Sequence, residues 1–190
     1  EQEQNISRYG EWPFEIGLWI GKAATPNIIV HKGEKSSDSA RAKVRQFKAN
    51  PKGRPSPIPL ENCPWCETRF EPDSFALHPN DDYPKQLRIV CTNFECDFTR
   101  DRALPIVAVD EPLYRRLPAF LIATVDKFAS LPWVGQTGAL LGGADRYDDS
   151  GFYGASEPGK GEKLTTPLPP PDLVIQDELH LISGPLGTMT

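Results

Sequence analysis

The stretch Leu173-Val174-Ile175-Gln176-Asp177-Glu178-Leu179-His180 gives the clearest indication of the fold. Its three leading apolar residues are typical of a buried strand in a parallel sheet, and they run directly into Asp-Glu-x-His. Open α/β sheets place their chemistry at the carboxyl ends of their strands. The stretch therefore predicts an α/β domain with a parallel sheet and a site at the end of this strand.

The charged residues of this stretch suit nucleotide hydrolysis. In nucleotide hydrolases of this architecture the Asp holds Mg²⁺, because a hard cation prefers oxygen ligands, and the Glu polarises the attacking water. Asp177 and Glu178 are thus candidate catalytic residues, with Asp177 on magnesium. His180 is expected to couple the nucleotide state to other parts of the protein.

A second strand-like run, Leu104–Val109, also ends in two carboxylates, Asp110 and Glu111. Pro112 follows at once, so Asp110 is more simply an N-cap for a following helix. No His stands two residues beyond Glu111. The stretch that ends at His180 is therefore the preferred candidate, and this pair remains its competitor.

Composition limits the classes of protein. The 190 residues are 38% hydrophobic, which is enough for a core, and the net charge of -5 argues against a uniformly basic nucleic-acid coat. No apolar run is long enough to span a membrane and no leader is recognisable, so we expect a cytoplasmic protein without a membrane partner. The chain begins with Glu1 and its one methionine is Met189, so we expect a piece of a longer protein.

Residues 36–50 are predicted to form a helix. Ala40, Val44 and Phe47 recur at helical spacing, Ser or Asp can cap the start, and Pro51 ends the pattern.

A basic face accompanies this helix. Arg41, Arg45 and Lys48 lie on a face next to the apolar one, and residues 32–54 contain eight basic and two acidic side chains. Clustered Lys and Arg can bind the phosphates of nucleic acid. A solvated helix face or a mobile loop explains the same pattern, and both interpretations stay open.

The four cysteines form two pairs, Cys63-Pro64-Trp65-Cys66 and Cys91-Thr92-Asn93-Phe94-Glu95-Cys96, after a proline-rich hinge at residues 54–59. Four thiolates brought together by two tight turns satisfy tetrahedral Zn²⁺, which can stabilise a lobe too small for its own core. A closed Cys₄ site is structural rather than catalytic. Disulfides are the alternative, and His78 could replace a cysteine.

Two further strands are predicted. Residues 12–21 are rich in aromatic and β-branched residues, and their Gly17 and Gly21-Lys22 fall one residue short of a phosphate-binding loop, with Ala23 in place of the required hydroxyl. Residues 119–123 form the other strand, which turns into a helix at Thr124. Thr124 and Lys127 could hold a backbone phosphate of nucleic acid, or Thr124 could merely cap the helix.

Residues 134–165 lack sustained periodicity and are predicted to be a mobile loop. Prolines between Pro167 and Pro171 stiffen the approach to the final strand.

Several motifs together resemble a known family. Asp177-Glu178-Leu179-His180 resembles motif II of superfamily 2 DExH helicases, the segment from Thr124 to Phe128 resembles motif Ic, and the segment from Gly17 to Gly21 resembles motif Ib. With Cys-Pro-Trp-Cys, the set is similar to the helicase-like subunit of the bacterial DISARM anti-phage system. The resemblance implies an ATP-dependent DNA helicase or translocase that uses Mg²⁺ and ATP and works with DNA and a companion defence subunit.

The expected organisation is a partial RecA-like parallel-sheet domain with a zinc-ribbon-like Cys₄ insertion. Residues 1–56 carry the first part of that domain and its basic helix, 57–102 the insertion, and 103–190 the remainder. No motif I lysine loop, motif III or second RecA-like domain is present, so this chain alone is expected to be inactive. The alternatives are a non-catalytic zinc-ribbon module that binds nucleic acid or protein, and a metal-dependent nuclease that uses Asp177 and Glu178.

Overall fold

The computed structural model describes residues 13–21, 24–34 and 36–177. The chain divides into two compact units, Glu1–Thr124 and Val125–Thr190. The segment boundaries expected near residues 56 and 102 stay predictions.

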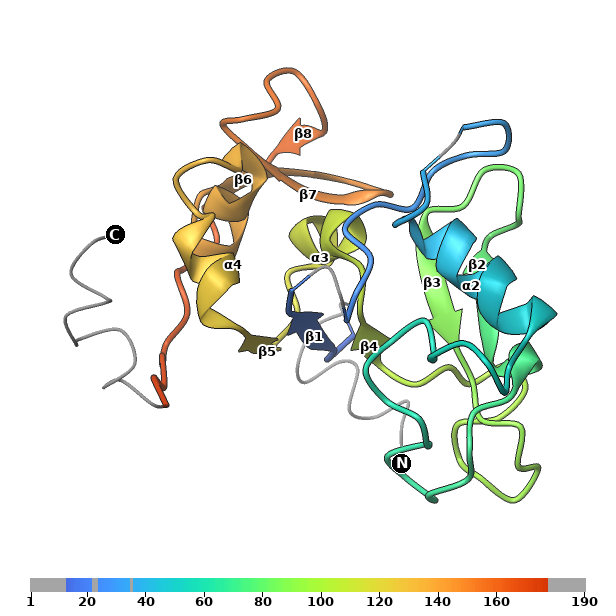
Figure 1. Ribbon diagram of the computed structural model, residues 1–190. Helices are drawn as coiled ribbons and strands as arrows, with labels where there is room; N and C mark the ends of the chain where they lie inside the picture. Colours follow the sequence, from blue (N-terminus) through green and yellow to red (C-terminus); the bar gives the residue numbers. More distant parts are fainter. Residues whose placement is uncertain (1–12, 22–23, 35, 178–190) are drawn as a thin grey trace, which may run out of the picture. The chain divides into compact units, whose positions relative to one another are not determined.

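The first unit contains a parallel sheet of three strands in the order β4-β1-β5 (Figure 1). Strand β1 (Ile16–Trp19) lies in the middle, between β4 (Ile106–Val107) and β5 (Phe120–Ala123). A Cβ on Gly17 would come within 2.8 Å of the Leu121 and Pro118 side chains, so any larger residue here would force these side chains to move. The expected α/β class with a parallel sheet is confirmed at this level.

Helix α3 (Asp110–Arg116) connects β4 to β5 and packs on β1 (Figure 1). Its N-cap is Val109, so the expectation that Asp110 caps the helix with its side chain is wrong. Asp110 is instead the first helical residue and is buried, where it accepts a hydrogen bond from the Tyr114 hydroxyl at 3.4 Å. Burial among apolar neighbours favours this hydroxyl partner over a solvated cap.

Helix α2 (Ala40–Ala49) confirms the predicted helix. Ser39 is its N-cap, and the Ser39 hydroxyl accepts a hydrogen bond from the Ala42 N–H at 3.2 Å. Ala40, Val44 and Phe47 are buried, as their helical spacing requires.

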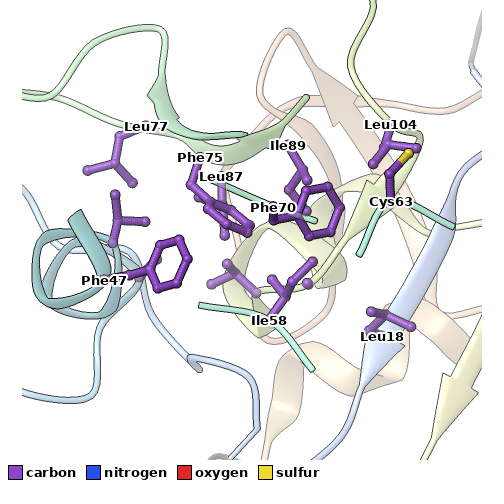
Figure 2. Packing of buried hydrophobic residues seen from close by; sticks show 14 of the residues in the cluster. Leu18, Phe47, Ile58, Cys63, Phe70, Phe75, Leu77, Leu87, Ile89 and Leu104 are labelled. Carbon is purple, nitrogen blue, oxygen red and sulfur yellow. The ribbon is translucent and has the colours of Figure 1, made fainter. Parts of the chain in front are cut away.

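The main core lies around an antiparallel hairpin of β2 (Phe75–His78) and β3 (Gln86–Ile89), which follows the short helix η1 (Pro72–Ser74). Phe75 is fully buried, and its ring meets those of Phe47 and Phe70 edge-on at 5.6 and 5.4 Å. Figure 2 shows these rings beside Ile58, with Leu18 and Cys63 in the same cluster. The cysteine-bearing segment therefore shares one core with α2 and β1.

The second unit contains α4 (Val125–Ala129), η2 (Gly135–Leu141) and an antiparallel sheet in the order β7-β6-β8. The sheet consists of β6 (Ala144–Asp148), β7 (Gly151–Gly154) and β8 (Glu162–Lys163), so the prediction of a mobile loop over residues 134–165 is wrong.

Local turn chemistry explains this difference. The Asp148 carboxylate accepts hydrogen bonds from the Ser150 N–H at 2.7 Å and from the Tyr153 hydroxyl at 3.1 Å. Tyr147 and Phe152 then pair across the strands with ring centroids 5.0 Å apart.

Leu173, Val174 and Ile175 form no strand and are 74%, 66% and 80% exposed, so the expected buried strand is absent from the described part of the chain. The physical reason is that a strand needs a hydrogen-bonded neighbour, and none of the described strands pairs with this segment. Asp177 is exposed and is the last described residue, while Glu178 and His180 lie outside the described residues.

Candidate functional site

The first pair of cysteines lies on a tight turn. The Cys63 N–H donates to the Thr68 carbonyl at 2.8 Å, and the Glu67 N–H donates to the Cys63 carbonyl at 2.9 Å. Glu67 closes the turn with a positive φ of 62°, a conformation that glycine adopts at lower cost. The turn that a zinc-binding pair requires thus forms without the usual glycine.

The second pair follows strand β3. The Cys91 N–H donates to the Phe98 carbonyl at 2.7 Å, and the Cys96 N–H donates to the Asn93 carbonyl at 3.1 Å. The wider spacing of this pair is therefore taken up within a hydrogen-bonded turn.

The four sulfur atoms converge. Cys63 Sγ lies 3.9 Å from Cys96 Sγ, Cys66 Sγ lies 3.5 Å from Cys91 Sγ, and all four ligand atoms lie within 4.8 Å of one another. Tetrahedral zinc with bonds of about 2.3 Å separates its sulfur ligands by roughly 3.8 Å. All four cysteines are free of disulfides. They could bind a metal such as zinc.

Backbone and hydroxyl groups already support negative charge on the sulfurs. The Asn93 and Phe98 N–H groups point at Cys91 Sγ and Cys96 Sγ, each at 3.4 Å. Hydrogen bonding with Thr68 lowers the pKa of the Cys66 thiol to about 6.

Burial works against ionisation at Cys91 and Cys96. Desolvation raises the pKa of Cys91 to about 12 and also raises the pKa of Cys96. Hydrogen bonding thus favours the thiolate at Cys66, whereas a bound metal would supply the charge that ionises Cys91 and Cys96.

The cysteine cluster is closed by the protein. Cys63, Cys91 and Cys96 are buried and belong to the main core, while Cys66 is half-buried. Four protein ligands leave no open position for a substrate, which is the arrangement of a structural site. The alternative ligand His78 is exposed, pairs with Gln86 at 3.3 Å and is not part of the cluster.

The residues expected to contact DNA lie in different environments. Thr124 is exposed at the end of β5, where its N–H donates to the Trp19 carbonyl at 3.2 Å. Lys127 is 7% exposed. Arg45 and Lys48 are exposed on α2, whereas the Arg41 Nε donates to the Val30 carbonyl at 3.3 Å. Their DNA contacts stay predictions, as do the roles of Asp177, Glu178 and His180.

The sequence did not suggest a buried polar chain at the carboxyl end of β1. Trp19 Nε1 donates to the Tyr114 hydroxyl at 3.1 Å, and that hydroxyl in turn donates to Asp110. Burial, with Asp110 nearby, raises the pKa of Tyr114 to about 12, so the hydroxyl stays protonated. Trp19 and Tyr114 lie 95 positions apart in the sequence, on β1 and α3, so no local sequence pattern indicates this contact.

The chain is similar to DISARM protein DrmA of Bacillus paralicheniformis, with 38% identity over 199 residues that cover 98% of this chain. The aligned region is 17% of the length of that protein. The similarity supports a relationship of this chain to DISARM proteins. No family model matches the chain. Among the described residues, no helix has both the length and the apolar composition needed to cross a membrane.

Proposed function

We propose that this chain is part of a DISARM-type anti-phage defence protein whose intact form is an ATP-dependent DNA helicase or translocase. The observation that carries the proposal is the 38% identity to DISARM protein DrmA across 98% of the chain. The parallel sheet β4-β1-β5 supports it, because nucleotide hydrolases of this architecture use the carboxyl ends of such strands. In this proposal the sheet belongs to a RecA-like domain.

The proposed catalytic residues are Asp177, which would hold Mg²⁺ of Mg-ATP, and Glu178, which would polarise water, with His180 coupling nucleotide state to the DNA site. The phosphate-binding loop would be supplied from beyond residues 1–190. Thr124, Lys127, Arg41, Arg45 and Lys48 would contact the DNA backbone, and a companion defence subunit would be the protein partner.

The decisive experiment is Glu178→Gln in the intact protein. ATP turnover should be abolished while nucleotide binding remains, because the variant keeps the residue's size but loses the carboxylate. Glu111→Gln is the matched control, since Glu111 belongs to the competing carboxylate pair and accepts a hydrogen bond from the Ile29 N–H at 3.1 Å. Normal ATP turnover in the Glu178 variant would contradict the assignment, and loss of turnover in the Glu111 variant alone would transfer it to the other pair.

The cysteines are proposed to hold one structural Zn²⁺. The support is the approach of all four ligand atoms to within 4.8 Å. Metal analysis of the purified protein should give about one zinc per chain, as a closed four-cysteine site requires. A protein that folds normally with no bound metal would contradict this part of the proposal.

A second candidate function is a non-catalytic zinc-ribbon module that binds nucleic acid or protein. It is favoured by one contrast, namely that the cysteine cluster is assembled while Leu173–Ile175 is exposed and pairs with no described strand. DNA binding that is indifferent to nucleotide, without ATP hydrolysis in the intact protein, would select this candidate. Cleavage of DNA with Mg²⁺ alone would instead select a nuclease.

A further inference from the structure

A cavity of about 250 Å³ lies between helix α2 and the proline-rich segment at residues 54–59. Its polar lining consists of the side chains of Ser37, Asp38, Lys43, Gln46, Arg54 and Ser56. None of these residues belongs to the cysteine cluster, to the carboxyl ends of the strands or to the predicted basic face.

Both walls of the cavity are anchored in the main core. Lys43 and Gln46 stand three residues apart on α2, beside the buried Val44 and Phe47 that fix the helix. On the opposite wall, the segment is held by Ile58, which is also buried in the core. The lining side chains therefore project from a backbone that packing holds in place.

The turn between the walls is closed by hydrogen bonds. The Gly53 N–H donates to the Asn50 side-chain oxygen at 2.9 Å, and the Ile58 N–H approaches the Ser56 hydroxyl oxygen at 3.4 Å. These bonds orient the short segment that carries Arg54 and Ser56 toward the helix.

The charges in the cavity favour an anion. Lys43 and Arg54 are cationic, Asp38 is the one carboxylate in the lining, and Arg54 makes no hydrogen bond or ion pair with any described residue. Lys43 is partly buried, and its desolvation lowers the pKa of its ammonium group, although the Asp38 charge opposes this shift. A bound anion would add a charge-assisted hydrogen bond to the interaction that Lys43 already has, and it would favour the charged form of the ammonium group.

We propose that this cavity binds a phosphate group. Lys43 and Arg54 supply charged N–H donors, while the Ser56 hydroxyl and the Gln46 amide supply neutral donors, which are groups that proteins use to contact phosphate. The Ser37 hydroxyl already donates to the Asp38 carboxylate at 3.4 Å. Either a phosphodiester of a nucleic-acid strand or a free phosphate offers this chemistry. Binding of a strand here rests on the proposed DNA-handling function, whereas binding of a free phosphate does not.

Exposed basic residues in the same stretch of the chain favour the strand as the source. Arg45 and Lys48 lie on the same helix, and Lys52 follows it; all three are exposed, and none makes an ion pair with a described residue. A strand with one phosphate in the cavity could place its neighbouring phosphates near these side chains. The cavity would then fix the position of the strand, and the exposed residues would add affinity that depends on salt.

The first test uses the intact protein and a fluorescently labelled single-stranded oligothymidine. The double variant Lys43→Gln/Arg54→Gln should bind at least tenfold more weakly and reduce the slope of log affinity against log salt by about 2, because about one unit is lost for each phosphate contact. Arg45→Gln/Lys48→Gln is the control with the same change in charge. At high salt, where contacts of exposed side chains are screened, only the Lys43→Gln/Arg54→Gln variant should still bind more weakly than the original protein. Equal losses in the two double variants at high salt would overturn the inference, since they would indicate a uniformly basic surface.

Asp38→Asn sharpens this test because it removes the carboxylate that opposes an anion. The variant should bind the oligonucleotide more tightly, by several-fold, with a steeper dependence on salt. Unchanged or weaker binding, in a variant that unfolds at the same temperature as the original protein, would contradict the inference.

A second readout separates the cavity from the proposed DNA function. Acetylation of Lys43, followed by mass spectrometry of the intact protein, should be slowed by pyrophosphate and by the oligonucleotide, while acetylation of Lys48 is slowed by the oligonucleotide alone. Protection by pyrophosphate without any DNA binding would support the cavity and count against the DNA-handling function. Absence of protection of Lys43 by either ligand would overturn the phosphate site.

Discussion

The cysteine cluster and the segment that leads to Asp177 were both predicted from short motifs, yet only the cluster is assembled in the described structure. The cysteines lie on two hydrogen-bonded turns and belong to the main core. Leu173–Ile175, by contrast, has a strand-like sequence but no strand neighbour among the described residues.

The difference shows which motifs have a structure that is determined by their own local sequence. A turn such as that from Cys63 to Thr68 is closed by bonds between residues a few positions apart, so the local sequence determines it. A parallel strand has all its hydrogen bonds to other strands, so its formation depends on groups that the motif does not contain. Both motifs are easy to recognise in the sequence. The turn forms from its own residues, whereas the strand needs hydrogen bonds from strands outside the motif.

The largest expected effect is that of removing a cysteine. Cys63→Ser should release the metal and destabilise the first unit by several kcal/mol, because structural zinc contributes on the order of 10 kcal/mol to small domains. Metal content and thermal unfolding measure the two effects. His78→Ala, which changes the histidine that lies outside the cluster, should keep one metal ion. Full metal content in the Cys63 variant would mean that the cysteines do not hold the metal.

Truncation of Phe75 should be the next largest effect. Phe75→Ala empties the centre of the core between Phe47 and Phe70 and should cost about 3–5 kcal/mol in denaturant unfolding. Phe94→Ala, at an exposed ring with a cation–π contact to Arg100, should cost less than about 1 kcal/mol. Similar costs for the two variants would show that Phe75 does not fill the centre of the core.

Tyr114→Phe tests the buried polar chain at the end of β1. The variant leaves Trp19 Nε1 without its acceptor and should cost about 1–3 kcal/mol near neutral pH.

Tyr114→Phe should also change how the unfolding free energy depends on pH. The pKa of Tyr114 rises from 10.0 to about 12 on folding, so between these values the folded protein keeps a proton that the unfolded chain has lost. Stability due to this group is complete below pH 10 and falls as the pH rises through about 12. In Tyr114→Phe this alkaline decline should be reduced, and an unchanged pH profile would exclude Tyr114 as its source.

A smaller, stabilising effect is expected at Glu67. Glu67→Gly should raise the unfolding free energy by up to about 1 kcal/mol, because glycine adopts the positive φ of 62° with less strain. Glu67→Ala removes the side chain but keeps the strain, so it should give no such gain. Equal thermal stabilities of the two variants would show that strain in this turn is negligible.

The smallest effect is expected in the segment Leu173–Ile175. Val174→Asp places a charge in the exposed apolar segment and should change the unfolding free energy of the 190-residue chain by less than about 0.5 kcal/mol. A loss above about 2 kcal/mol in chemical denaturation would indicate that the segment is buried in solution, and the contrast with the cysteine cluster would then disappear.

Periodicity and local spacing predicted a substantial part of the structure. The apolar spacing of Ala40, Val44 and Phe47 gave helix α2, and the apolar runs near residues 16, 106 and 120 gave the three parallel strands. The cysteine spacing gave the candidate metal centre, because four sulfurs in two tight turns have few other arrangements.

The parts that the sequence did not reveal depend on contacts between distant residues. Trp19 and Tyr114 are 95 positions apart, and neither residue indicates the other. The sheet of the second unit depends on cross-strand pairs such as Tyr147 and Phe152, within a stretch whose many glycines and charges conceal any alternation. The cavity at Lys43 likewise joins a helix to a segment that the sequence marks only as a hinge.

The parallel pairing of β1 has a consequence for how quickly the chain can fold. Ile16 pairs with Ile106, a separation of 90 positions, so the sheet cannot close until a long intervening stretch has been brought together. A metal ion bound by Cys63 and Cys96 would close a loop over 33 of these positions, and this would lower the entropic cost of bringing the strands together. Refolding should therefore be faster when zinc is present from the start than when it is added after the denaturant has been diluted.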